Sequence, residues 1–511
     1  MGFSDLNKPK KLLGSNSVQI ASPTSTFGQV MVESFFPVAQ GDFVYGINDQ
    51  NFTTSEIMGS TVSAANGICS LESGTNASGS ATVQLRRGLK YRPGQGAAAK
   101  ITAVYDTPNS GNAQFVGVGS AESGYFIGYF GTNFGILHAD DGDREIRKLE
   151  VTTGSGTESV DITLDGNTIT VPITGSSDTT QTAYQIALQD YSQLGSGGWL
   201  ADAVGSSVYF ISARAGAAFD GSYSVSSAGS IAGTFSQVQD SQAQNTTFIA
   251  SSSFNIDKLD GTGPSGMTLD TTKGNVYEVQ YQYLGFGNAT FSVEDPETGF
   301  LVPFHMIKNA NVRTTPVLKN PNTSVLATSA NIGGTTNTTL KTVSMGAYTE
   351  GQIQNLDPKF GKAFSFPTVN SATYKPVALL KVNRVYRNQS CYGEFDLLEI
   401  GASNESAAAS PKTLVVGLFK KPVISGDVNY QYVDEDNSVV SYAQLSTSTN
   451  TISNLADIEP FYTFIVGAGQ GVQKNIRDLQ FAHGLGQEIL IAVKTTGNVA
   501  GQILVNWFEQ Q

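Results

Sequence analysis

The chain has 511 residues and is acidic, with 30 lysines and arginines against 43 aspartates and glutamates and a formal net charge of −13. This balance argues against nucleic acid and anionic membrane as general partners. Only 14% of the residues are charged, against about 25% in an average globular protein, whereas 40% are hydrophobic. These values exclude a disordered chain, and the length predicts about two to four domains.

Residues 1–80 are predicted to form a polar arm followed by a short β region. The arm carries the cluster Lys8, Lys10 and Lys11. Three cations hold phosphate weakly, so two interpretations remain open: a solvated arm, or an assembly arm that docks on a neighbouring subunit or particle. The first thirty residues lack the apolar run of a signal peptide, and no segment reaches the roughly 18 apolar residues of a membrane span.

Short alternating strands separated by Gly, Asn and Asp dominate the next region and favour antiparallel sheets. They are dense over residues 81–144 and again over 245–350, as in Lys100–Tyr105 and Val276–Tyr283. Strands of the same character on both sides of a different segment predict one β-sandwich that is split by an insertion. The fold class is therefore mainly β and antiparallel.

The intervening residues 145–244 predict a small α+β domain. Ile162–Val171 holds two β-rich arms around Asp-Gly-Asn, which is a strong hairpin signal. Apolar residues recur at helical spacing over Thr179–Leu194, and Gly195 follows as a stop signal. The strand Val208–Ala213 completes the unit.

Residues 351–511 predict a C-terminal β-sandwich domain. The two cysteines, Cys69 and Cys391, lie far apart in the sequence and form no CxxC pair. The sequence allows two alternatives: a disulfide between the two cysteines, or two separate buried thiols. The second is favoured.

Four blocks of the chain together carry a resemblance to a known group of proteins. The blocks are residues 91–96 (YRPGQG), 128–138 (GYFGTNFGILH), 273–277 (KGNVY) and 283–287 (YLGFG). Over about residues 25–350 the chain is similar to large structural proteins of tailed bacteriophages and large DNA viruses. The resemblance implies a virion component, such as a capsid decoration, vertex, fibre or tail-associated protein. It also implies a concanavalin-like jelly roll, a fold often used to contact glycans.

The expected function is assembly with copies of itself and with other virion proteins, and a trimer is favoured by analogy with fibres and spikes. The chain would be made in the host cytoplasm and reside in the virion. A surface of Ser, Thr and Asn suits this role because it depends little on ion pairs, which salt screens within about 10 Å at 0.1 M. The alternative function is a host-receptor or glycan-binding module.

Catalytic signatures are scarce, so the chain is predicted not to be an enzyme. The three histidines, His138, His305 and His483, stand alone, and the sequence contains neither HExxH nor GxSxG. A polysaccharide depolymerase is the last-ranked alternative, because it needs two carboxyls about 5–10 Å apart. The best local cluster, Glu294–Glu297, is predicted to be a turn.

Calcium is the one cofactor candidate. Asp140, Asp141, Asp143 and Glu145 place four carboxylates within six residues, and calcium prefers six to eight oxygen ligands. The spacing is not that of an EF-hand, so a solvated turn is the competing interpretation.

Exposed aromatic residues are the candidates for glycan binding. Tyr129, Phe130, Tyr283 and Phe286 could present ring faces to a sugar. Strand alternation would instead bury one face of each strand, which would place most such rings in the core.

Overall fold

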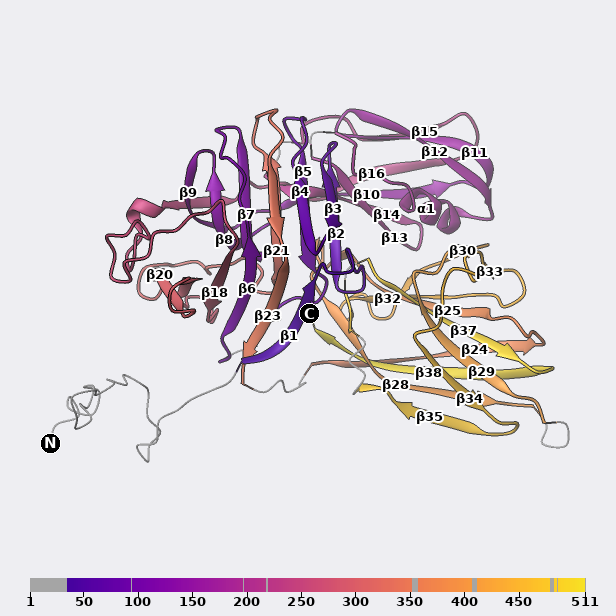
Figure 1. The fold of residues 1–511 in the computed structure, drawn as a ribbon. Helices are drawn as coiled ribbons and strands as arrows, with labels where there is room; N and C mark the ends of the chain where they lie inside the picture. The colour runs from indigo at the N-terminus through magenta and orange to yellow at the C-terminus, as the bar shows by residue number, and fades with distance from the viewer. Residues whose placement is uncertain are drawn as a thin grey trace, which may run out of the picture.

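The structure is a computed structural model, and it describes residues 35–510 except 93, 196, 217–218, 352–356, 407–410, 478–481 and 485. The arm with Lys8, Lys10 and Lys11 lies outside the described residues, so its docking stays a prediction. Strands dominate the described chain, as predicted, and three β-rich units are visible in Figure 1. Within this part of the chain, no helix has the length and apolar character needed to cross a membrane.

Two large antiparallel sheets form the first sandwich. The six-stranded sheet has the order β1 (Phe35–Asp42), β23 (Ser344–Glu350), β6 (Ala97–Ala103), β18 (Asn275–Tyr281), β19 (Ala289–Glu294) and β20 (Leu301–Ile307). The seven-stranded sheet has the order β17 (Asn245–Ala250), β9 (Asn133–Asp140), β8 (Gly124–Phe130), β7 (Asn112–Gly119), β21 (Ser324–Asn331), β5 (Ser80–Leu85) and β2 (Phe52–Ile57). A small third sheet comprises β22 (Thr339–Thr342), β4 (Ile68–Glu72) and β3 (Thr61–Ala65).

The early strands belong to this sandwich, although residues 1–80 were expected to stand apart from it. β1 pairs with β23 in the six-stranded sheet, and β2 pairs with β5 in the seven-stranded sheet. The early strands therefore belong to both sheets of the sandwich. Their inward side chains are buried between the sheets, as Phe52 and Cys69 show. The hydrophobic gain of closing the sandwich on these residues explains why they join it.

The core of the sandwich follows strand alternation. Tyr125 and Ile127 of β8 point inward and are fully buried, as are Val279 of β18 and Phe291 of β19. The predicted concanavalin-like sandwich is therefore confirmed in its class: two packed antiparallel sheets around one apolar core.

The inserted domain contains the predicted hairpin, helix and strands. Its elements are β10 (Arg144–Thr153), β11 (Gly156–Leu164), β12 (Asn167–Ser176), α1 (Thr179–Ala187), β13 (Trp199–Val204), β14 (Ser207–Ala215), β15 (Ser224–Ser227) and β16 (Ala232–Gln239). β10, β13, β14 and β16 form one sheet, whereas β11, β12 and β15 form a second. Asp165 and Gly166 both have positive φ, as the tight β11–β12 turn requires.

The helix is shorter than predicted. Asp178 caps its start by accepting hydrogen bonds from the backbone N–H groups of Thr180 and Gln181, each at 2.9 Å. The helix ends at Ala187, whereas the periodicity extended to Leu194. Tyr191 lies outside the helix in an isolated β-bridge with Trp199, but its ring packs back and its hydroxyl donates to the Ile186 carbonyl at 2.9 Å.

The C-terminal domain is a second sandwich, as predicted. One sheet contains β24 (Lys359–Val369), β38 (Val499–Gln510), β28 (Glu394–Asn404) and β35 (Gly471–Asn475), with β36 (Ala482–His483) beside β28. The other has the order β31 (Gln431–Tyr432), β32 (Val440–Gln444), β25 (Lys375–Val382), β37 (Glu488–Thr495), β29 (Leu414–Lys420) and β34 (Tyr462–Val466). Cys69 and Cys391 are both buried and free, which confirms the interpretation as separate thiols.

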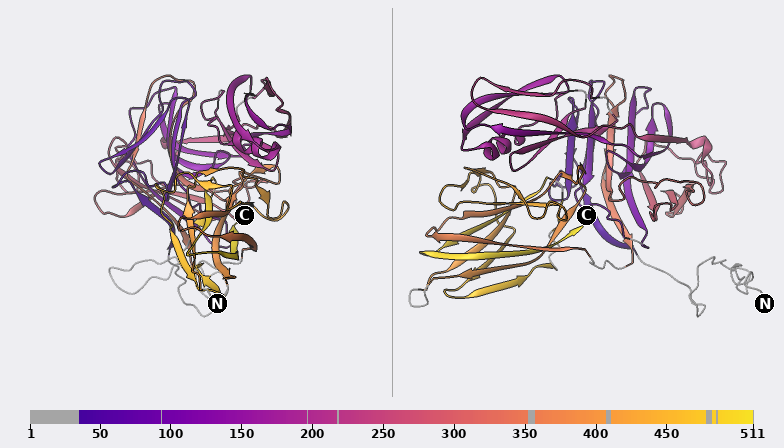
Figure 2. Two further views of the ribbon diagram at one scale, coloured as in Figure 1. Left: turned by 90° about the vertical axis from the view of Figure 1, so that its right-hand side faces the viewer. Right: turned by 180° about the vertical axis from the view of Figure 1, so that it is seen from behind.

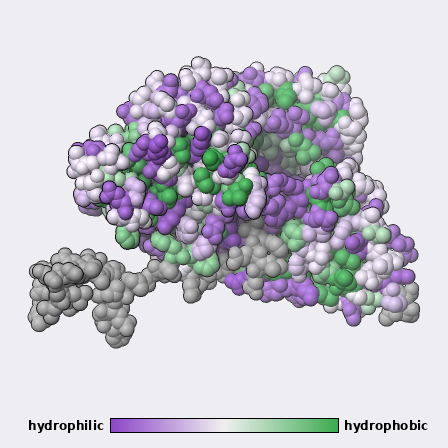
Figure 3. All heavy atoms as spheres, viewed as in Figure 1, coloured by the Kyte–Doolittle hydropathy of each residue, from purple (hydrophilic) through white to green (hydrophobic). Residues whose placement is uncertain are grey.

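The inserted and C-terminal domains lie on the same side of the first sandwich, and the three units meet near the C-terminus (Figures 1 and 2). Charged pairs join them. Lys90 of the first sandwich lies 3.3 Å from Glu394 of β28, and Arg87 lies 3.7 Å from Asp396. Hydrophilic side chains gather near this region in the space-filling view of Figure 3. Arg87 and Lys90, which precede the YRPGQG block, therefore form ion pairs at the junction between the units.

The C-terminal core offers a direct test of this packing. Ile491 on β37 is fully buried, whereas Ile465 on β34 is 65% exposed. We expect Ile491→Ala to lower the free energy of unfolding by about 2–5 kcal/mol, because it leaves a cavity. Ile465→Ala should change the stability by less than about 0.5 kcal/mol. Urea unfolding followed by the fluorescence of the tryptophans, including the buried Trp507, measures both, and equal losses would contradict the packing.

Candidate functional site

Two of the predicted glycan-contact residues lie at the end of β8. The Tyr129 hydroxyl lies 2.8 Å from Thr271 Oγ1, and its ring packs edge-on against Tyr105 and Phe134. Phe130 is exposed and has its ring 5.8 Å from that of Phe248. Tyr129 is thus a packing residue, and Phe130 alone of this pair presents its side chain to solvent.

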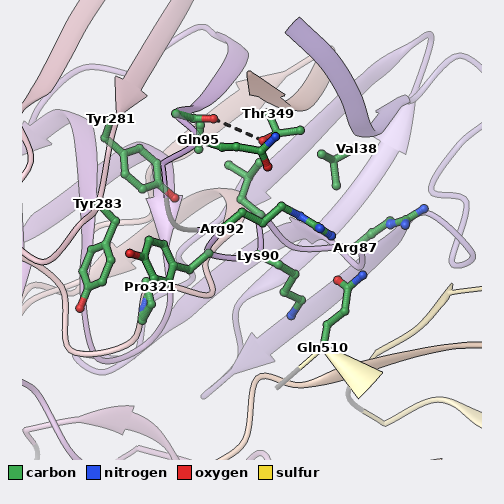
Figure 4. Close-up of a pocket in the computed structure, with 14 residues that line it drawn as sticks. Val38, Arg87, Lys90, Arg92, Gln95, Tyr281, Tyr283, Pro321, Thr349 and Gln510 are labelled. Atoms are coloured by element: carbon green, nitrogen blue, oxygen red, sulfur yellow. Dashed lines mark hydrogen bonds between the residues drawn. The ribbon is translucent and has the colours of Figure 1, made fainter. Parts of the chain in front are cut away.

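The other two predicted residues follow the end of β18. Tyr283 packs edge-on against Tyr91 and donates to the Leu318 carbonyl at 3.2 Å. The cavity beside it, at the junction in Figure 4, has a volume of about 20 Å³, which holds about one water. Phe286 is exposed on the loop before β19. Tyr283 and Phe286 follow the end of β18, whereas Tyr129 contacts Thr271 just before β18 begins. The two pairs therefore lie at opposite ends of this strand and do not form one site.

The carboxylates of the acidic turn form ion pairs with arginine and lysine side chains of the same chain. Asp140 contacts Arg313, and Asp143 lies 2.5 Å from Lys319, which is also 3.9 Å from Asp141. Glu145 lies 2.5 Å from Arg147. Among the described residues no group of three or more His, Cys, Asp or Glu side chains is placed to hold a metal ion. Calcium at Asp140, Asp141, Asp143 and Glu145 stays a prediction.

The three histidines are packing residues in this structure. His138 Nε2 lies 2.8 Å from the Val317 carbonyl, and its ring stacks on Tyr125. His305 accepts the backbone N–H of Asn255 at 3.2 Å. Burial lowers the pKa of His483 to about 3, so this ring is neutral at physiological pH.

The cluster Glu294–Glu297 is a turn, as predicted. Asp295 accepts the backbone N–H of Glu297 at 3.0 Å and the Thr298 hydroxyl at 2.8 Å. The carboxylate of Asp295 is therefore used to hold the chain reversal between β19 and β20.

A groove of about 590 Å³ lies on the outer face of the six-stranded sheet. Three neighbouring strands form its floor, because alternate residues of β1, β23 and β6 point outward there. The outward side chains that line it are Gln40, Asp42, Lys100, Thr102, Ser344 and Tyr348. The turn after β1 forms the rim and carries Tyr45, which is 100% exposed.

Tyr348 lies across the floor of the groove. A Cβ atom at Gly346, the preceding outward position of β23, would lie 2.7 Å from the Tyr348 hydroxyl and 2.9 Å from its Cε2. The ring therefore passes directly over the glycine, which leaves room for it. Phe35 of β1 packs edge-on against the ring at 6.4 Å and holds it from the side. This arrangement fixes an aromatic surface on a rigid sheet.

Polar groups surround this ring in defined positions. Lys100 Nζ is 3.4 Å from the buried Glu278 carboxylate, which anchors a partly exposed ammonium at the groove. Thr102 Oγ1 accepts the backbone N–H groups of Val343 and Ser344 at 2.8 and 3.0 Å. Asp42 Oδ1 accepts the Val44 N–H at 3.0 Å and so shapes the turn that presents Tyr45. The groove combines aromatic rings with an ammonium, a carboxylate, amides and hydroxyls.

Sequence reasoning missed this groove. Its residues come from strands separated by up to about 300 positions, and each strand contributes only a few of them. The local signal was the Gly346-x-Tyr348 spacing in a strand, which places a glycine and an aromatic ring on one face.

Comparisons with known proteins identify no family for this chain. No family model and no curated protein matches it. The potassium-bound carbohydrate recognition domain of Emp46p is 8% identical over 61% of this chain and 96% of that chain, with a TM-score of 0.23. A legume lectin-like domain from Entamoeba histolytica is 10% identical over 58% and 90%, with a TM-score of 0.20. A triple jelly roll protein of an archaeal virus turret is 10% identical over 94% and 98%, with a TM-score of 0.15. Likenesses this weak carry no argument about function.

The two cations that pair with the acidic turn, Arg313 and Lys319, are expected to contribute differently to stability. Asp140 is buried and depends on Arg313, whereas the Lys319 pairs with Asp141 and Asp143 are more exposed. Arg313→Ala should destabilise the first sandwich by about 3–5 kcal/mol, because it leaves a buried carboxylate without its cation. Lys319→Ala should cost about 1 kcal/mol or less. Thermal unfolding compares the two variants, and a larger loss for Lys319→Ala would show that Arg313 does not hold the turn.

Proposed function

We propose that this chain is a non-enzymatic surface protein of a virion whose first sandwich binds host glycans in the groove over β1, β23 and β6. The observation that carries the proposal is the Tyr348 ring, which lies over Gly346 among outward polar side chains. A sugar has an apolar face of C–H groups and an edge of hydroxyls. It therefore needs an aromatic surface together with hydrogen-bonding groups at fixed positions.

The dimensions and chemistry of the groove support this function. Its volume of about 590 Å³ falls within the roughly 300–1,000 Å³ of small-ligand sites. Gln40 and Asp42 on β1 can bind sugar hydroxyls as donor and acceptor, while Lys100 adds a charged donor from β6. Tyr45 at the rim can close over a second sugar unit. Sites on rigid strands are already arranged for the ligand, which lowers the entropic cost of binding.

Binding to a panel of immobilised glycans, followed by calorimetry on the best ligand, tests the proposal. Tyr348→Ala and Tyr45→Ala should each weaken binding at least about tenfold, equivalent to about 1.4 kcal/mol. Phe286→Ala is the matched control, because it removes an exposed aromatic ring outside the groove. Each variant should keep the thermal stability of the original chain.

Two results would overturn the glycan site. If no glycan on a broad panel binds the folded chain, the function is rejected. If Phe286→Ala abolishes binding and Tyr348→Ala does not, the site lies on the loop before β19 instead.

Assembly without glycan binding is the second candidate, and one surface favours it. Leu284, Phe286 and Val312 are exposed apolar residues on two loops at one end of the first sandwich. The loops are joined by hydrogen bonds from Val317 N–H to the Gly285 carbonyl and from Asn309 Nδ2 to the Gly287 carbonyl. Exposed apolar groups gathered in one place are typical of a protein contact, here with other virion proteins or with copies in a trimer.

Purified particles test the assembly role. Mass spectrometry should detect the chain in virions, and Leu284→Ser with Val312→Ser should strongly reduce its incorporation, because the apolar contact is lost. Phe300→Ser is the control, since Phe300 is exposed on the turn between β19 and β20. Absence of the chain from purified virions would refute any virion role.

A further inference from the structure

A buried lysine and a buried aspartate meet where the inserted domain contacts the C-terminal domain. Lys381 lies on β25 and Asp202 on β13, and each side chain is only 9% exposed. Lys381 Nζ contacts Asp202 Oδ1 and also donates to the Ala203 carbonyl at 2.8 Å. The amine is thus held against the carboxyl group of another domain.

The Asp202 carboxyl group is fixed from its other side. Its Oδ2 accepts the backbone N–H of Arg384 at 2.8 Å. One carboxyl oxygen therefore faces the amine while the other faces an amide donor. A donor in this position would stabilise negative charge on that oxygen if the carboxyl carbon were attacked.

A second carboxyl group stands beside the pair. Glu488 of β37 is the direct cross-strand partner of Lys381, so the two side chains share one face of the sheet. Tyr430 donates its hydroxyl to Glu488 Oε1 at 2.8 Å, and its ring centre lies 4.0 Å from Lys381 Nζ. Burial raises the pKa of Glu488, which makes this carboxyl group suited to exchanging a proton.

From this geometry we propose that Lys381 and Asp202 condense to an isopeptide bond that joins the inserted domain covalently to the C-terminal domain. Lys381 passes a proton to the Asp202 oxygen Oδ1 that it contacts, and the neutral Nζ attacks Cγ of the resulting carboxylic acid, forming a C–N bond. The bond from Cγ to Oδ1 then breaks. Oδ1 leaves as water after it takes up a second proton from Nζ, which the neighbouring Glu488 carboxyl group relays. An ammonium and a carboxylate become one amide and one water, with no oxidant or other reactant.

Burial favours the product over the ion pair. Two desolvated ions cost several kcal/mol each before their attraction is counted, whereas an amide carries no net charge. A cavity of about 120 Å³ lined by Asp202, Lys381 and Glu488 gives the released water a place to go. A water occupies about 30 Å³ in the liquid, so the cavity is large enough.

An exposed pair in the same chain provides an internal comparison. Lys421 contacts Asp49, but these side chains are 55% and 50% exposed. Water solvates both ions there, so exchanging the ion pair for a neutral amide relieves little desolvation. The reaction is therefore expected at Lys381 and not at Lys421.

Intact-mass spectrometry of the purified full chain tests the bond. We expect a mass lower than the sequence mass by one water, and a branched peptide joining Lys381 to Asp202 after proteolysis. Lys381→Arg and Glu488→Gln should each restore the full sequence mass. Asp202→Asn should lose one ammonia instead of one water, because the amide nitrogen then leaves. Lys421→Arg should still lose one water.

Two outcomes would overturn the bond. One is the full sequence mass in the folded original chain after prolonged incubation. The other is a loss of water that persists in Lys381→Arg, which would place the dehydration elsewhere, for example at Asp165-Gly166. Because the first result needs no variant, a substitution that fails to fold does not weaken the test.

Discussion

Paired charges at the junctions between units fix how the three β-rich units sit together. The chain has few charged residues, yet Lys90 with Glu394 and Lys381 with Asp202 are buried at these contacts. An ion taken out of water is tolerated only when its partner is present, so each pair permits one placement of two units and penalises others. The apolar cores stabilise each unit, and the ion pairs decide their arrangement.

The fixed arrangement of the sheets supports the proposed binding surface. The outer face of the six-stranded sheet carries the groove beside β1, and Gly346 leaves room there for the Tyr348 ring. A ligand that meets such a surface does not have to order it first. The same packing holds Lys381, Asp202 and Glu488 side by side, which is the arrangement that the proposed condensation needs.

Much of the fold followed from local patterns. Alternating strands predicted the split sandwich, the inserted unit and the C-terminal sandwich, and Asp165-Gly166 predicted the hairpin between β11 and β12. The predicted helix extended beyond Ala187, because Tyr191 keeps the helical spacing although it lies outside the helix in a bridge with Trp199. Among the four aromatic candidates, Tyr129 and Tyr283 pack against neighbouring rings, whereas Phe130 and Phe286 are exposed.

The sequence by itself determined the β class and the order of the units, because period-two alternation and turn residues act between near neighbours. Only the tertiary structure decided the groove and the buried junction. Gln40, Lys100 and Tyr348 come from three strands far apart in the chain, and Asp202 and Lys381 come from different domains. Strand pairing and domain contact bring such residues together. No local sequence pattern predicts which distant side chains will lie on the same face of a sheet or be buried against one another.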